Sequence, residues 1–405
     1  MEESALLWAL ALGLVGGLLL LALASRLKVK APFIVAYFAY LAVGLTRYFF
    51  LGLQADAVTY HNIARQQVLA DEGLVSVTRG MSAGKASLSD FLYFSYSTFG
   101  ISPIPGLILA ALCAGLLPIA VKATCENFGW ARSSTTAAWL IVAVPQFVVW
   151  IPALRREALS FALLAMMMWA VSLVYCRRTG LGFLLLTASA ALTSITRSQL
   201  VVVAFVGLTG AILVRPPRPP LARRAIGLIT GVAFAALIAI LNIPFFSLGN
   251  LSGDGIDRVI RSNASEFQNL AVPGASASYN LSPVGLVLNV PRFWMGPLPW
   301  EYRNLAWVLV AADGLVMGVA LVLCILVVRK DRLARNPAFV LLLMCTPIAI
   351  GGTVALANYG IAWRVRDHLI VLLVPILARF WSGVRKHLSD GSTAIASGRS
   401  ANSIR

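Results

Sequence analysis

The sequence has 405 residues, of which 59% are hydrophobic and only 12% are charged, and its mean hydropathy is +0.83. Soluble globular proteins carry about 25% charged residues, so this composition excludes an ordinary soluble enzyme and indicates that lipid surrounds most of the chain. The net charge of +17 is high enough for nucleic-acid binding. The basic residues, however, fall in short clusters between long apolar runs, and we expect no nucleic-acid partner.

The apolar runs predict an all-α, polytopic integral membrane protein. Within lipid only helices and closed barrels satisfy every backbone polar group, and the runs here are continuous rather than alternating, which favours helices. Hydropathy predicts about eleven spans within a single transmembrane domain over residues 1–386. They are Ala5–Ala24, Pro32–Phe49, Ile101–Val121, Thr135–Ile151, Ala158–Cys176, Leu181–Thr196, Gln199–Val214, Ala225–Pro244, Leu305–Val328, Pro337–Ala357 and Leu369–Trp381.

The segments between the spans predict how the chain is oriented. Lys- and Arg-rich loops stay in the cytoplasm, and with the N-terminus outside the inner loops receive nearly all of the excess positive charge. The residues 53–99 and 245–304 then form two long extracytoplasmic segments, and residues 215–224, with the run RPPRPP, form an inner connector. The basic tail, residues 387–405, is predicted to be cytoplasmic and disordered.

Several charged or titratable side chains occur at the predicted outer helix ends, where the topology rule does not explain them. Such residues are costly near the bilayer and are usually functional. They are Asp56, Arg155, Arg156, Glu157, Arg197, Glu301, Arg303, Asp313, Arg364, Arg366, Asp367 and His368.

The polar stretch QADAVTYHNIAR, residues 54–65, contains the first candidate residues. Asp56 and Tyr60 are four residues apart and share one face of a helix, and His61 follows. A carboxylate at the mouth of a helical bundle can act as a general base or bind a metal. The alternative is that Asp56 caps the N-terminus of an amphipathic helix.

The arginines at these ends predict a site for a phosphate group, because a guanidinium offers a planar fork to phosphate oxygens. Arg155 and Arg156 lie in a short turn beside Glu157, which can pair with one of them, and Arg197 interrupts a long apolar stretch. The alternatives are contact with lipid headgroups for the first two and a simple hairpin position for Arg197.

Arg364 and Arg366 are two residues apart, so an extended segment would put both on one face, whereas a helix would not. Asp313 is expected to pair with an outer arginine or to form a hydrogen bond within the bundle. The residues that could form a mixed site for a divalent metal ion are Asp56, His61, Asp367 and His368. Histidines that are hydrogen-bonded rather than metal-bound are the alternative.

Four stretches resemble the GT-C class of membrane glycosyltransferases, which use polyprenyl-phosphate sugars. The stretch ADAVTYHNIA resembles the acidic residue, Tyr and small residue of their first outer loop, although Ala55 stands where the family often has a second acid, and an extra helix precedes it. The other three stretches resemble a loop helix, a basic–acidic turn and a late Arg-rich segment of bacterial members. They are FLYFSYSTFGISPIPGLIL, PQFVVWIPALRREALSFALL and NYGIAWRVRDHLIVLLVPIL.

The resemblance implies an inverting transferase of cell-envelope polysaccharide biosynthesis in a bacterial plasma membrane. Its partners would be membrane lipid, a polyprenyl-phosphate-linked sugar and a glycan or lipid acceptor. Asp56 would be the catalytic base, with Glu157 as the second catalytic candidate. The substrate-binding residues would be Tyr60, His61, Arg155, Arg156, Arg197, Arg364, Arg366 and His368.

Two other functions stay open from the sequence. A polysaccharide polymerase or ligase of the O-antigen type also joins lipid-linked glycans outside the cell, and it relies on outer arginines without a metal. A transporter or lipid flippase is the second alternative. Transporters typically contain inverted repeats and broken helices with polar residues near the membrane centre, whereas this sequence has no visible repeat and its polar residues lie at the outer ends.

Overall fold

The computed structural model describes residues 2–53, 55–70, 86–214, 283–296, 305–331, 334–354, 356 and 359–401. Within these ranges the chain is almost entirely helical and contains no strand, which confirms the all-α prediction. The helices are α1 (Glu2–Arg26), α2 (Lys30–Leu51), α3 (Ala55–Leu69), α5 (Ala86–Phe99), α6 (Ile104–Asn127), α7 (Ala131–Val142), α8 (Pro145–Trp150), α9 (Arg156–Tyr175), α10 (Thr179–Arg197), the 3₁₀ turn η1 (Ser198–Leu200), α11 (Val201–Val214), α14 (Pro283–Met295), α15 (Leu305–Lys330), α16 (Arg335–Val354) and α17 (Tyr359–Ala401).

The described part of the chain contains seven helices that are long and apolar enough to cross a membrane, which supports a polytopic membrane protein. They belong to α1, α2, α6, α9, α10, α15 and α16, and α11 is a shorter apolar helix. The predicted number of eleven is not confirmed. The predicted span Ala225–Pro244, the connector 215–224 and most of the segment 245–304, with Glu301 and Arg303, lie outside the described residues.

One predicted span, Thr135–Ile151, is two helices in the structure. α7 ends at Val142, and the short α8 begins at Pro145. A proline has no backbone N–H to donate and its ring clashes with the preceding turn, so it starts a helix more readily than it continues one. The residue before it, Val144, has the extended backbone that a following proline favours. The break turns α8 away from the α7 axis.

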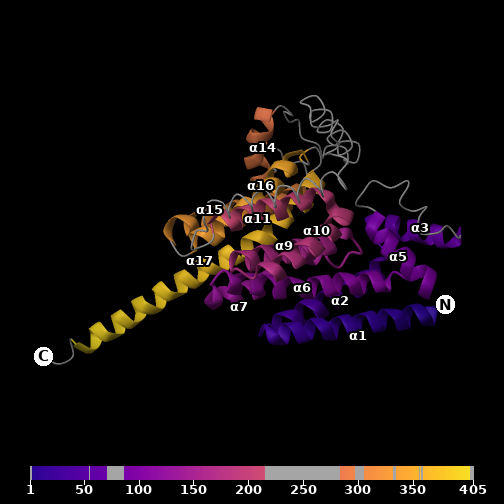
Figure 1. Cartoon of the computed structure of the whole chain (residues 1–405), viewed down its shortest axis with the longest axis horizontal. Helices are drawn as coiled ribbons and strands as arrows, with labels where there is room; N and C mark the ends of the chain where they lie inside the picture. Colours follow the sequence, from indigo (N-terminus) through magenta and orange to yellow (C-terminus); the bar gives the residue numbers. More distant parts are fainter. Residues whose placement is uncertain are drawn as a thin grey trace.

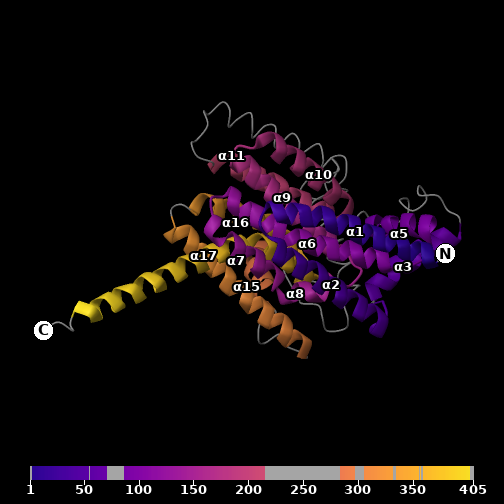
Figure 2. The same ribbon diagram turned by 90° about the horizontal axis from the view of Figure 1, so that it is seen from below.

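α6 is the central helix of the bundle, packing against α1, α2, α7, α9 and α17 (Figures 1 and 2). Its side chains are buried along nearly the whole length, whereas most of α1 is exposed. Two glycines allow close packing. A Cβ atom at Gly115 would lie 2.8 Å from the Phe33 ring of α2, and one at Gly106 would overlap Leu154, which precedes α9. Leu154 thereby rests directly on the start of α6.

α3 and α5 pack against each other at one end of the bundle (Figure 1), around a small apolar cluster that includes Ala57, Tyr60, Leu92 and Tyr96. The N-terminus lies at the same end, because the Trp8 ring stacks on Phe99 of α5 with centroids 4.5 Å apart. Since the long helices run from end to end, the basic residues that follow α1, α9 and α15 lie at the opposite end.

α17 has 43 residues and packs against α7, α15 and α16 through apolar residues such as Leu369, Val371 and Leu372. It then continues beyond the other helices toward the C-terminus (Figure 1). The helix therefore includes the predicted last span, Leu369–Trp381, and remains helical to Ala401, where the sequence predicts a disordered tail from residue 387.

Candidate functional site

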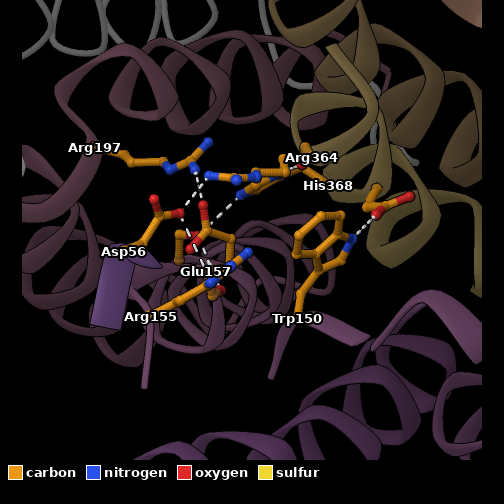
Figure 3. Close-up of polar contacts among 9 residues, drawn as sticks. Asp56, Trp150, Arg155, Glu157, Arg197, Arg364 and His368 are labelled. Atoms are coloured by element: carbon orange, nitrogen blue, oxygen red, sulfur yellow. Dashed lines mark hydrogen bonds and ion pairs between the residues drawn. The ribbon is translucent and has the colours of Figure 1, made fainter. Parts of the chain in front are cut away.

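Four helix ends converge beside the α3–α5 pair and bring charged side chains together. They are the first turns of α3, α9 and α17 and the last turn of α10 (Figure 3). We call the resulting group the charged cluster, and its members are Asp56, Arg155, Arg156, Glu157, Arg197 and Arg364. All six are candidate residues from the sequence, although they come from positions up to 308 residues apart.

The Asp56 carboxylate binds two arginines from different helices. Arg364 Nη1 donates a hydrogen bond of 2.8 Å to Asp56 Oδ2, and Arg155 Nε lies 3.7 Å from the same oxygen. Asp56 is in the first turn of α3, rather than at the residue before the helix, so its carboxylate serves the cluster instead of capping α3. Its side chain is 38% exposed, which leaves the carboxylate accessible to a ligand.

Glu157 has a different environment, because its side chain is only 3% exposed and forms an ion pair of 2.8 Å with Arg197 of α10. The sequence predicts pairing with Arg155 or Arg156 instead. Successive residues on a helix point about 100° apart, so Glu157 turns toward α10. Arg156 lies within electrostatic range of both partners. A carboxylate this buried and paired holds α9 against α10 and is poorly placed to accept a proton from a substrate.

Trp150, the last residue of α8, contacts both arginines that bind Asp56 (Figure 3). The guanidinium carbons of Arg155 and Arg364 lie 5.3 Å and 5.1 Å from the indole centroid, within the range of cation–π attraction. The indole Nε1–H donates a hydrogen bond of 2.6 Å to Asp367 Oδ2. Trp150 is not among the residues predicted for the site, although an aromatic residue five positions before an Arg–Arg pair is a usable signal.

His368 links α17 to α9 next to the charged cluster. Its Nδ1–H donates to the backbone carbonyl of Arg364 at 2.9 Å, and Nε2 lies 2.9 Å from Ser160 Oγ. The carbonyl can only accept, which assigns the Nδ1 proton, and the imidazole also packs on Phe161 with ring centroids 4.5 Å apart. His368 is therefore a fully buried, hydrogen-bonded residue that fixes the backbone carrying Arg364.

Tyr60 and His61 continue from Asp56 along α3. Tyr60 is buried beside the cluster, and its pKa is raised mainly by this burial, against the opposing effect of Arg156. His61 forms a hydrogen bond between its Nδ1 and the hydroxyl of Tyr96 of α5, at 2.7 Å. Burial, with a smaller contribution from Arg65, lowers the pKa of His61 and favours the neutral ring.

We expect His61 to make the fold sensitive to acid. Its unfolded pKa is about 6.5 and its folded pKa is lower, so below pH 6.5 the unfolded chain binds the proton first and stability falls with pH. The thermal unfolding midpoint of the wild type should drop between pH 7.5 and pH 5.0 by more than that of His61→Gln. Equal drops in the two proteins would exclude this role.

The predicted mixed Asp/His metal site does not fit the described residues. Within these ranges, no group of three or more His, Cys, Asp and Glu side chains is arranged to hold a metal ion. Both ring nitrogens of His368 are engaged, His61 is bonded to Tyr96, and Asp56 is bound by arginines.

Arg366 is not part of the charged cluster. Residues 364 and 366 are helical, so Arg366 points into the bundle, where its side chain is 2% exposed and donates to Asp313 Oδ2 at 2.6 Å and to the Gly296 carbonyl at 2.7 Å. Gln146 of α8 binds the other Asp313 oxygen. Both alternatives expected for Asp313 are present, a pair with an arginine and a hydrogen bond within the bundle, and the predicted substrate-binding role of Arg366 gives way to a structural one.

A small, partly open apolar groove adjoins the cluster, between the end of α2, the start of α3 and the turn before α9. Ala57 follows Asp56 and Leu154 precedes Arg155. The groove therefore opens beside the contact between Asp56 and Arg155. Its lining is apolar apart from Arg47 and Tyr48, and consists of Gly44, Arg47, Tyr48, Gly52, Leu53, Ala57, Leu107, Pro152, Ala153 and Leu154.

No protein-family model, curated protein or solved structure matches the chain. The function is therefore argued from the charged cluster and the groove themselves.

Proposed function

We propose that this protein is a membrane glycosyltransferase that moves a sugar from a polyprenyl-phosphate donor to an extracytoplasmic glycan or lipid acceptor. The observation that carries the proposal is a partly exposed carboxylate, Asp56, held between Arg155 and Arg364 at the mouth of an apolar groove. Under this proposal the protein is in a bacterial plasma membrane, with its N-terminus outside and its C-terminus in the cytoplasm.

The charge balance of the cluster supports a phosphate-bearing substrate. Four arginines surround two carboxylates, so the cluster carries two positive charges in excess. The phosphodiester of the donor would neutralise one of them, and the polyprenyl phosphate that leaves, a monoester dianion, would neutralise both. Charge-assisted hydrogen bonds from guanidinium groups are among the strongest available. Arginines fixed in place before the reaction stabilise the negative charge that develops on a departing phosphate.

The groove supports a substrate with an apolar chain. The groove is small and partly open, so only the part of a polyprenyl chain next to the phosphate would lie against it. Isoprene units there would contact Leu53, Leu107 and Leu154, while the phosphate reached Arg155. The groove would in this way bind the isoprene units of a lipid-linked donor, and the arginines would bind its phosphate.

In the proposed reaction Asp56 accepts the proton of an acceptor hydroxyl. The hydroxyl oxygen attacks the anomeric carbon of the sugar from the face opposite the phosphate, and a new C–O bond forms with inversion. The bond between the anomeric carbon and the phosphate oxygen breaks, and the polyprenyl phosphate leaves with the electron pair. Arg155 and Arg364 bind the leaving phosphate, which requires them to loosen their hold on Asp56.

The direct test is to incubate the purified full-length protein with radiolabelled polyprenyl-phosphate sugars and lipid-linked acceptors, and to analyse the glycolipids. Transfer of label with release of polyprenyl phosphate supports the proposal. Movement of intact lipid-linked sugar across vesicles without any new glycolipid would instead favour a flippase.

Filling the groove should weaken donor binding without changing the chemistry. Ala153 lines the groove and is 7% exposed, so Ala153→Leu adds three carbons where the donor chain would lie. We expect KM for the donor to rise about tenfold, the effect of losing roughly 1.4 kcal/mol of binding, with kcat nearly unchanged. Ala143→Leu, at an exposed position after α7, is the control, and equal KM values in both variants would refute the role of the groove.

One observation favours a second candidate, a polysaccharide polymerase or ligase of the O-antigen type. Asp56 is paired with two arginines, as expected for a carboxylate whose role is to hold those arginines in position. In such an enzyme the arginines carry the reaction, so Arg155 and Arg364 variants would lose activity while Asp56→Asn kept most of it.

A further inference from the structure

Trp150 is part of the hydrophobic core and packs edge-to-face on Trp363, but it also makes polar contacts that packing alone does not require. Its indole face meets two guanidinium groups, Arg155 from the turn before α9 and Arg364 from α17. Its edge donates to Asp367, which is fully buried on α17. The ring is 6% exposed, so these contacts are formed out of water, where cation–π attraction is strongest.

The two arginines need such a contact because they repel each other. Arg364 has the largest like-charge effect on Arg155, and the carboxylate that both arginines contact, Asp56, is partly exposed and therefore screened. The electron-rich face of one indole attracts both guanidinium groups at once. Both groups also approach the same oxygen of Asp56, at 3.7 and 2.8 Å, so the indole can hold them close together before any ligand arrives.

Asp367 determines the angle of the indole. Arg364 and Asp367 are three residues apart on α17 and so lie on the same side of the helix. Trp150 lies across both, with its face to Arg364 and its edge to Asp367. The second oxygen of Asp367 has no hydrogen-bond partner within the described residues, so the bond to Trp150 is its one side-chain contact there.

We propose that Trp150, oriented by Asp367, is a positioning residue that holds Arg155 and Arg364 as a preformed pair for the phosphate of the substrate. This inference rests on the proposed function, because it assigns the pair to the phosphate of the polyprenyl donor. Trp150 and Asp367 would act on the substrate only through the two arginines.

The test measures binding of farnesyl monophosphate, a short polyprenyl phosphate, to the full-length protein in detergent. Trp150→Leu removes the aromatic face, and we expect the Kd to rise tenfold or more. Asp367→Leu removes the acceptor and should raise the Kd about fivefold, whereas Asp367→Asn keeps an acceptor and should stay within about twofold of the wild type. Trp139→Phe, at a half-exposed position on α7, is the matched control.

A spectroscopic signal separates positioning from packing. In protein labelled with 5-fluorotryptophan, the ¹⁹F resonance that disappears in Trp150→Phe belongs to Trp150. Farnesyl monophosphate should shift this resonance and leave that of Trp139 unchanged. If Trp150→Leu does not fold, Trp150→Phe replaces it, since it keeps a ring but loses the N–H and should raise the Kd about threefold.

The outcomes separate the inference from the function. Folded Trp150 and Asp367→Leu variants that bind farnesyl monophosphate like the wild type overturn the inference, even if sugar transfer is observed. A wild type that does not bind this probe overturns both the inference and the proposed donor. Normal binding with the expected losses, but without sugar transfer, supports the positioning role and rejects the transferase.

Discussion

Asp56→Asn should lower kcat for sugar transfer by about 10²- to 10⁴-fold, the usual contribution of a general base. Asparagine can still accept a hydrogen bond from Arg364 but cannot take a proton from the acceptor hydroxyl. Because Asp56 is 38% exposed, its ion pairs contribute little to folding, and the thermal unfolding midpoint should change by no more than a few degrees. Radiolabelled transfer and a thermal scan on the same preparation measure both quantities.

Asp331→Asn is the matched control for this variant. Asp331 is also partly exposed and paired with an arginine, Arg379, but it follows α15 at the opposite end of the bundle. It should leave kcat unchanged. A nearly normal kcat in Asp56→Asn, together with inactive Arg155→Lys and Arg364→Lys, would contradict the base role and identify the arginine-dependent polymerase or ligase.

The second large effect is on stability. Arg366→Met should destabilise the protein by about 3–5 kcal/mol, since it leaves the buried carboxylate of Asp313 without its charged partner. The Gly296 carbonyl loses its donor in the same change. Arg379→Met, which removes a pair that is 25% and 30% exposed, should cost at most about 1 kcal/mol. The thermal unfolding midpoints of the two variants in one detergent make the comparison.

A double variant distinguishes an unpaired charge from simple loss of packing. Asp313→Leu combined with Arg366→Met removes both charges and fills most of their volume, so it should be more stable than Arg366→Met alone. A double variant that is less stable than either single one would mean that the polar network with Gln146 and Gly296 supports this region without the ion pair.

The sequence was sufficient to predict a polytopic membrane protein and a concentration of charge at one end of its helices. Both follow from terms that act residue by residue, namely the transfer of apolar side chains into lipid and the retention of basic loops in the cytoplasm. It also predicted that Asp313 has either an arginine or a hydrogen-bonding partner, because a carboxylate within an apolar helix is costly, and the structure contains both.

The partners within the site could not be predicted in the same way. Arg197 pairs with Glu157 because α10 ends where α9 begins, and Trp150 meets Arg364 because Pro145 redirects α8. Such contacts depend on how helices cross, which local sequence does not specify. The placement of Arg366 depended on whether its segment was helical or extended, and the spacing of the residues allowed either.

The contrast between α1 and α6 has a consequence for how the protein responds to its bilayer. The two helices have nearly equal hydropathy, 2.5 and 2.4, yet α1 is mostly exposed and α6 is mostly enclosed by protein. Acyl chains therefore act on α1 directly, and a change in bilayer thickness would alter its tilt. Gly16 of α1 lies against Leu112 of α6 so closely that a Cβ there would be 2.8 Å away. A change in the tilt of α1 would therefore act on the central helix through this contact surface.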